Sequence, residues 1–214
     1  DLGGPEAAAR AARYRFLESL ADECAADWIA VGHTADDRAE TVLMRALQGV
    51  GVAGLGGMPA QRGRIVRPLN ALRRGDLRAW LSKEGMPFRR DRHNIDQRFM
   101  RNRVRRLIRM IEGRFPGATN RLVAVGRQAE STQRFVSGLA ASELEWRQVP
   151  LGVSVPWLPF QRAHPTMQRE AIYQGYDLLL SGAGHRRLPL RFVSALLRLV
   201  ANGNRRVHIK GHGV

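Results

Sequence analysis

The fold class is decided by residues 28–41, which read Trp28-Ile29-Ala30-Val31-Gly32-His33-Thr34-Ala35-Asp36-Asp37-Arg38-Ala39-Glu40-Thr41. An apolar run of this kind after a charged turn is typical of a buried parallel strand. The residues that follow predict a helix ending at Gly49, and residues 5–26 predict a helix before the strand. Helix–strand–helix at this spacing is half of a doubly wound unit, so we predict an α/β fold.

Three carboxylates and one imidazole lie where this strand ends and the helix begins. Asp36 and Asp37 start the helix, and Glu40 shares a face with them. His33 comes directly before the helix. Ligands of open α/β sheets bind at such strand ends, where carboxylates can hold the magnesium that accompanies a nucleotide. The alternative is that Asp36 or Asp37 only caps the helix and interacts with its dipole.

The next segments add a glycine-rich loop and several helices. Five glycines lie within 49–60, and a loop of this composition can approach a ligand closely with its backbone. We predict an edge strand over 65–69, because Pro68 lacks a backbone N–H. A linker is expected at Pro156 and Pro159. Further helices are predicted over about 73–84, from Asn94 or Asp96 to Glu112, and over 117–147, 165–180 and 189–201.

Charge is the unusual feature of the composition. The 214 residues include 35 basic and 19 acidic side chains, a net charge of +16. Residues 62–127 carry 19 basic and 5 acidic groups, a net of +14, whereas residues 1–61 have a net of −4. A concentrated excess of this kind indicates a surface that binds a polyanion. For the arginines of 101–106, a solvated helix face with general affinity for phosphates is the alternative to a specific role, and it applies most to Arg103 and Arg106.

Several classes of protein are disfavoured by the same sequence. Cys24 is the only cysteine, which argues against a disulfide scaffold and a zinc ribbon. No run of 18 apolar residues indicates a membrane span, and the acidic start lacks the apolar core of a secretory signal. We therefore expect a cytoplasmic protein that does not bind membranes.

Four motifs in order resemble the N-type ATP pyrophosphatase, or PP-loop, family, and specifically the tRNA(Ile)-lysidine synthases. They are the Gly-His-x-x-Asp-Asp-x-x-Glu-Thr run at 32–41, the glycine segment at 48–58, Arg67-Pro68-Leu69, and a block with Asp91, Asn94 and Arg101-Asn102-Arg103-Val104-Arg105. The resemblance implies a partial Rossmann-like PP-loop nucleotide-binding domain over 1–115. A mostly helical linker or substrate-binding domain is implied over 116–214.

The resemblance implies an ATP-dependent ligase that modifies tRNA. Such an enzyme adenylates C2 of the cytidine at the first anticodon position of tRNA(Ile) with anticodon CAU, then joins free lysine to give lysidine and releases AMP and pyrophosphate. The residues implied for catalysis are Asp37, Glu40, His33 and Asp36. Those implied to bind ATP or tRNA are Arg101, Asn102, Arg105, Gly49, Gly51, Gly54 and Asn94. Asp37 and Glu40 are also the implied ligands of Mg²⁺.

One family signature is missing, and alternatives therefore stay open. The Ser-Gly-Gly-x-Asp-Ser loop does not occur in this sequence. We interpret the chain as a fragment that lacks this N-terminal loop and expect it to be inactive alone. The alternatives are a non-catalytic RNA-binding fragment and a PP-loop tRNA thiolase, although the single Cys24 disfavours the thiolase. The oligomeric state is open, with a homodimer as one alternative.

Overall fold

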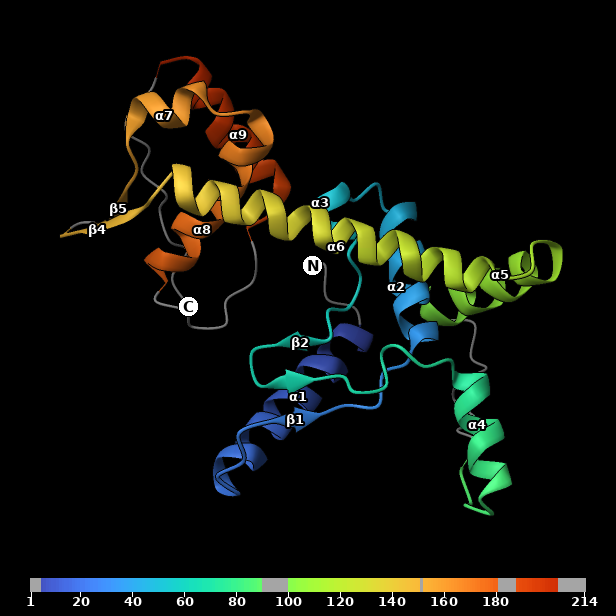
Figure 1. Ribbon diagram of the computed structural model, residues 1–214. Helices are drawn as coiled ribbons and strands as arrows, with labels where there is room; N and C mark the ends of the chain where they lie inside the picture. Colours follow the sequence, from blue (N-terminus) through green and yellow to red (C-terminus); the bar gives the residue numbers. More distant parts are fainter. Residues whose placement is uncertain (1–4, 90–99, 151, 181–187, 204–214) are drawn as a thin grey trace. The chain divides into compact units, whose positions relative to one another are not determined.

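The computed structural model describes residues 5–89, 100–150, 152–180 and 188–203 (Figure 1). Contacts between residues divide the chain into two units, Asp1–Ser131 and Thr132–Val214. The helix that crosses this division is α6 (Ala118–Glu143). The two predicted functional domains, 1–115 and 116–214, stay a prediction. No helix among the described residues has both the length and the apolar character needed to cross a bilayer.

The first unit contains a small sheet of three short strands, in the order β1 (Ile29–Ala30), β3 (Ile65–Val66), β2 (Gln61–Arg62). Strand β1 pairs in parallel with β3, as expected for an α/β unit, and Ile29 lies opposite Ile65. The expectation of an edge strand at 65–69 is wrong. A tight turn at Gly63, with φ of +56°, folds β2 back against β3, so β3 is the middle strand.

Helix α2 (Ala35–Leu47) follows β1 and positions the candidate site. Thr34 caps it: the Asp37 carboxylate accepts hydrogen bonds from the Thr34 backbone N–H and hydroxyl. The chain leaves the helix through Gly49, whose φ of +68° suits glycine, as predicted. The other helices of this unit are α1 (Pro5–Glu23), α3 (Val52–Leu55), α4 (Arg74–Lys83), α5 (Met100–Arg114) and the first part of α6.

The core of the first unit lies where α2 meets α5 and α6. Its buried residues are Ala35, Ala39, Val104, Ile108 and Val123. The small side chains of α2 let α5 pack close to it. The polar side chains of α5 that flank this core can therefore contact α2. Two residues of this unit that are commonly buried lie outside the core: Trp80 is 52% exposed, and Cys24 is exposed too.

The second unit is mostly helical, in agreement with the prediction. It contains the rest of α6, a hairpin of β4 (Arg147–Val149) and β5 (Gly152–Ser154), and helices α7 (Trp157–Arg162), α8 (Pro165–Leu179) and α9 (Leu190–Ala201). Its buried core consists of Ala140, Leu144, Phe160, Ala171, Ile172 and Val193. The linker predicted at Pro156 and Pro159 is instead the start of α7, because proline fits the first turn of a helix.

Candidate functional site

Two carboxylates on α2 meet three guanidinium groups from other elements of the first unit. We call Asp37, Glu40, Arg74, Arg101 and Arg105 the acid–arginine cluster. Arg74 begins α4, and the other two arginines lie one helical turn apart on α5. Glu40 and Arg105 are 65 positions apart in the sequence. The fold therefore brings the acidic motif at 32–41 next to the arginine motif at 101–105.

Glu40 is the most buried charged group of this cluster, with a side chain only 3% exposed. Its Oε1 accepts a hydrogen bond from Arg105 Nε at 2.6 Å. Its Oε2 accepts from Arg101 Nε at 2.8 Å and from Arg105 Nη2 at 3.2 Å. Arg74 Nη1 lies 3.7 Å from Oε1. A carboxylate this buried is tolerated because cationic donors pair with both of its oxygens.

Asp37 uses its two oxygens for different purposes. Oδ2 accepts from the Thr34 N–H at 2.9 Å and from the Thr34 hydroxyl at 2.7 Å, which is the capping role. Oδ1 accepts from Arg74 Nη2 at 2.8 Å and Arg101 Nη2 at 3.0 Å. Burial would raise the pKa of Asp37, but the Thr34 donors and the two guanidiniums hold the pKa below its usual value. Asp37 therefore stabilises the helix start with one oxygen and joins the acid–arginine cluster with the other.

Asp36 and His33 lie beside this cluster but outside its ion pairs. Asp36 Oδ2 accepts from the Arg74 backbone N–H at 2.7 Å, and both of its oxygens lie 3.4 Å from Arg73 Nε. Asp36 thereby fixes the start of α4. Burial lowers the pKa of His33 to about 4; Asp37 opposes this change, while Arg67 and Arg101 add to it. The His33 ring is therefore neutral at pH 7.

Helix α5 separates its arginines into two groups. Arg101 and Arg105 are 24% and 19% exposed and turn toward α2. Burial would lower the pKa of Arg105, but the Glu40 hydrogen bond and charge raise it. Asn102 lies next to this pair, with Oδ1 3.5 Å from Arg105 Nη1. Arg103, Arg106 and Arg109 are exposed on the other side of the helix.

The predicted glycine residues are not part of the acid–arginine cluster. The glycine segment is held on a different face of α2, where Arg45 Nη1 donates to the carbonyls of Gly54 and Gly57 at 2.5 and 2.9 Å. Arg38 Nη2 donates to the Gly56 carbonyl at 3.2 Å. Ligand binding by Gly49, Gly51 and Gly54 stays a prediction. Asn94, another predicted binding residue, lies outside the described residues.

Sequence reasoning missed Arg74. Its contacts with Asp37 and Glu40 depend on the path of the chain after β3, which the motifs do not reveal. One signal was present: Arg73 and Arg74 stand at the start of a predicted helix, where the dipole disfavours cations. Two arginines in that position indicate nearby carboxylates.

The cluster does not fit Mg²⁺ in the arrangement that the fold builds. All four carboxylate oxygens of Asp37 and Glu40 already accept hydrogen bonds from N–H or O–H donors. Within the described ranges, no group of three or more His, Cys, Asp or Glu residues is placed to hold a metal ion. The arrangement instead presents partly exposed guanidinium groups, which suit phosphate oxygens.

The amino-acid sequence is similar to those of several known proteins. The chain is similar to the tRNA(Ile)-lysidine synthase of Geobacter sulfurreducens, at 36% identity over 93% of this chain and 43% of that protein. The corresponding protein of Treponema pallidum strain Nichols is 32% identical over 97% of this chain and 45% of its own length. That of Salinispora tropica is 46% identical over 48% of this chain and 32% of its length. The chain thus spans less than half the length of these curated relatives.

The sequence model of the PP-loop domain family matches residues 2–111, about half of the chain. Among solved structures, the U34-tRNA thiolase NcsA from Methanococcus maripaludis with its 4Fe-4S cluster is similar with a TM-score of 0.49. It is 20% identical and covers 61% of this chain and 44% of that chain, too weak a likeness to support a conclusion. The matched range includes α2, Arg74, Arg101 and Arg105, and the chain belongs to the PP-loop domain family.

Proposed function

We propose that this chain acts in a tRNA(Ile)-lysidine synthase, an ATP-dependent ligase that modifies tRNA. The proposal is supported by relatives of that name, which match 93% and 97% of the chain at 36% and 32% identity. The observation that carries it is the acid–arginine cluster. This cluster joins the acidic motif on α2 to the arginines of α5 at one end of a parallel strand pair.

The proposed reaction has two steps. The C2 carbonyl oxygen of the cytidine at the first anticodon position of tRNA(Ile), anticodon CAU, attacks the α-phosphorus of ATP, and pyrophosphate leaves. The amine of free lysine then attacks C2, the C2–oxygen bond to AMP breaks, and the amine loses a proton. Both steps spread negative charge over phosphoryl oxygens, so fixed cationic donors stabilise their transition states.

The arginines of the cluster supply those donors. Arg74, Arg101 and Arg105 are 28%, 24% and 19% exposed, so parts of their guanidinium groups can reach a ligand. Three guanidiniums against two carboxylates leave one positive charge in excess. We assign Arg101 and Arg105 to phosphate or nucleotide binding and add Arg74, which makes the same kind of contacts.

The carboxylates orient those arginines before the substrates bind. Glu40 contacts all three guanidinium groups, and Asp37 contacts two of them while it fixes the helix start. Such preorganisation avoids a reorganisation cost during the reaction. Asp36 supports the start of α4, and neutral His33 borders the site. Because the cluster does not fit Mg²⁺, any magnesium that accompanies ATP would take its ligands from other groups.

Other parts of the proposal concern residues and partners outside the cluster. We retain Asn102, Gly49, Gly51, Gly54 and Asn94 as candidates for binding ATP or tRNA. The basic stretch at 62–127 supports tRNA as the polyanionic partner. Cytoplasmic localisation and a homodimer stay predictions.

The direct test measures AMP formation by the protein expressed from its complete reading frame. We expect AMP to form only when ATP, lysine and tRNA(Ile) with anticodon CAU are all present. RNA binding without AMP formation would favour a non-catalytic RNA-binding protein. Transfer of sulfur in place of lysine would favour a thiolase; the only cysteine, Cys24, lies exposed after α1.

A matched pair of variants on α5 tests the site. Arg101→Glu removes two hydrogen bonds to the carboxylates and adds a like charge beside them. We expect it to lower kcat/KM by about 100-fold or more. Arg103→Glu makes the same charge change on the exposed side of α5 and should cost only a few-fold. Equal kinetics for the two variants would return Arg101 to the solvated-face interpretation.

A further inference from the structure

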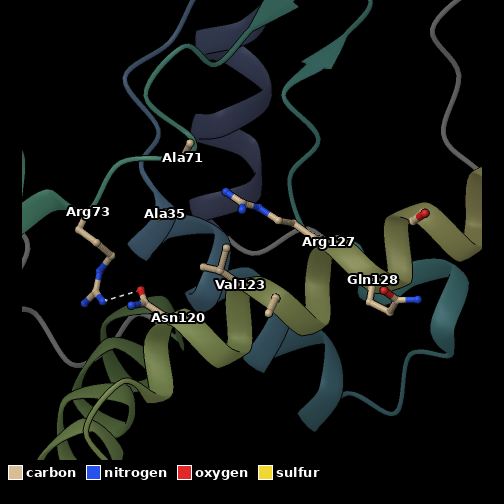
Figure 2. Close-up of a pocket in the computed structure, with 9 residues that line it drawn as sticks. Ala35, Ala71, Arg73, Asn120, Val123, Arg127 and Gln128 are labelled. Carbon is tan, nitrogen blue, oxygen red and sulfur yellow. Dashed lines mark hydrogen bonds between the residues drawn. The ribbon is translucent and has the colours of Figure 1, made fainter.

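A second polar concavity lies next to the acid–arginine cluster within the first unit. It is a pocket of about 490 Å³, bounded by the start of α2, the segment before α4 and the first half of α6. Its lining residues are Ala35, Ala71, Arg73, Asn120, Val123, Ala124, Arg127, Gln128 and Ser131 (Figure 2). We call it the Arg73–Arg127 pocket. Arg73 precedes Arg74 of the cluster in sequence, so the pocket adjoins the proposed reaction site.

The lining combines hydrogen-bond donors with small apolar side chains. Two guanidiniums, two amides and one hydroxyl face it, and the described lining residues include neither an acidic nor an aromatic side chain. Arginine forks, amides and hydroxyls are the groups that contact nucleic-acid phosphates. Base recognition in single-stranded RNA normally uses aromatic stacking, which this lining does not offer. The chemistry therefore fits a phosphate group better than a nucleobase.

The two arginines of the pocket differ in how they are held. Arg73 is held in place by two neighbours. Its Nε lies 3.4 Å from both oxygens of Asp36, and its Nη1 donates to Asn120 Oδ1 at 3.0 Å. Arg127 is exposed and extends from α6 toward Ala35 and Ala71 (Figure 2). Among the described residues, no side chain or carbonyl pairs with the Arg127 guanidinium. Asp36 offsets only one of the two positive charges.

We propose that the Arg73–Arg127 pocket binds a backbone phosphate of the RNA substrate and so places the target nucleotide beside the acid–arginine cluster. This inference rests on the proposed function. Arg127 makes the main contact with the phosphate, while Arg73, Asn120 and Gln128 complete its surroundings. The ligand is a phosphodiester, which carries one negative charge and matches the charge that Asp36 leaves uncompensated.

ATP is the other source of phosphate, and the lining argues against it. Triphosphates are commonly cradled by backbone N–H groups of a glycine-rich loop together with a metal ion. The described lining residues include no glycine and no carboxylate that could hold such an ion. An RNA backbone needs only exposed side-chain donors, as this pocket provides.

The test compares Arg127→Ala with Arg134→Ala in the protein from the complete reading frame. Both arginines are exposed on α6, and Arg134 lies outside the pocket lining. Binding of a tRNA(Ile) transcript is measured at several salt concentrations. We expect Arg127→Ala to weaken binding about tenfold, because a charged hydrogen bond is lost. The slope of log Kd against log salt should fall by about 1, as for the loss of one phosphate contact.

Further measurements separate the outcomes. Gln128→Glu adds a negative charge to the pocket and should also weaken RNA binding. For all three variants, the KM for ATP should stay within about twofold of the value for the unmodified protein. Equal RNA binding by Arg127→Ala and Arg134→Ala would overturn the proposal, as would a raised KM for ATP with RNA binding intact. Absence of AMP formation by the unmodified protein would contradict the proposed function only, because RNA binding is read independently of it.

Discussion

Helix α2 carries buried charges on two faces, and the faces differ in what they hold. On one face, Asp37 and Glu40 pair with guanidiniums that are 19–28% exposed. On the other, Arg38 is 5% exposed, pairs with Glu130 at 2.5 Å and donates to the Gly56 carbonyl. Both faces are networks of ion pairs and hydrogen bonds. On the first face, parts of the guanidinium groups stay within reach of a ligand, whereas the Arg38 side chain is buried.

This difference shows that a buried charge is not by itself evidence of a functional site. The Arg38 face fixes the glycine segment and α6 to α2, because Arg38 Nη2 donates to the Gly56 carbonyl and to the Glu130 carboxylate. The Glu40 face concentrates three cations around two anions and keeps a net positive charge. Variants of the two faces should therefore separate stability from catalysis.

The largest expected effect comes from Glu40→Gln. The variant removes the buried carboxylate that pairs with Arg101 and Arg105, while Arg101 keeps its contact with Asp37. Breaking a buried ion pair on one side typically costs 3–5 kcal/mol, and we expect the free energy of unfolding to fall by about 3 kcal/mol. Denaturant unfolding measures it. Glu84→Gln, at an exposed position after α4, is the control and should change stability little. A neutral effect of Glu40→Gln would mean that the cluster does not stabilise the fold.

On the opposite face, Arg38→Met should be milder. It removes the hydrogen bonds to Gly56 and Glu130, but Glu130 is 25% exposed and can be hydrated again. We expect a loss of about 2 kcal/mol in the free energy of unfolding. Hydrogen exchange should increase in the glycine segment 49–57, because Arg38 no longer holds it. Unchanged exchange there would contradict the assigned role of this face.

The strand–helix unit and the cap at Asp37 could be predicted because both depend on contacts between residues close in sequence. Arg101 and Arg105 were predicted through family motifs rather than through physics, since their contacts with Glu40 span more than 60 positions. Arg74 was missed because the loop after β3 decides where it lies. Strand β2 was missed as well, because exposed Gln61 and Arg62 show no apolar alternation.

In contrast to Glu40, the carboxylate of Glu112 is held by neutral donors. Glu112 accepts hydrogen bonds from the Thr119 hydroxyl at 2.6 Å and from the N–H groups of Thr119 and Gly117 at 2.7 Å. The pKa of Glu112 is lowered to about 2. The main cause is the pair of hydrogen bonds from the Thr119 hydroxyl and N–H, and the bond from the Gly117 N–H adds to it. The stabilising effect of Glu112 is therefore present above pH 4.5 and lost as the pH falls toward 2.

Glu112→Gln tests this linkage. We expect it to cost about 1 kcal/mol at pH 7, comparable to the loss of a helix cap. The difference in unfolding free energy between the unmodified protein and the variant should shrink between pH 4.5 and pH 2. A difference that is constant over that range would show that the charge of Glu112 does not contribute.

The smallest effect concerns His33, which borders the Glu40 face. Its pKa of about 4 lies below the usual 6.5, so the unfolded chain takes up a proton first as the pH falls. Stability linked to His33 is thus complete above pH 6.5 and decreases as the pH falls toward 4. An NMR titration of the ring should show a midpoint near 4. A midpoint near 6.5 would mean that the ring is solvated and not buried beside Arg67 and Arg101.

The most direct test of the central claim is the rate of lysine- and tRNA(Ile)-dependent AMP formation per folded molecule, for Asp37→Asn and Arg38→Met in the protein from the complete reading frame. The two residues are neighbours on α2 and lie on its two different charged faces. We predict that Asp37→Asn lowers the rate by about 100-fold or more, while Arg38→Met stays within about threefold of the unmodified protein. Equal losses in the two variants, or full activity of Asp37→Asn, would contradict the assignment of the acid–arginine cluster as the site.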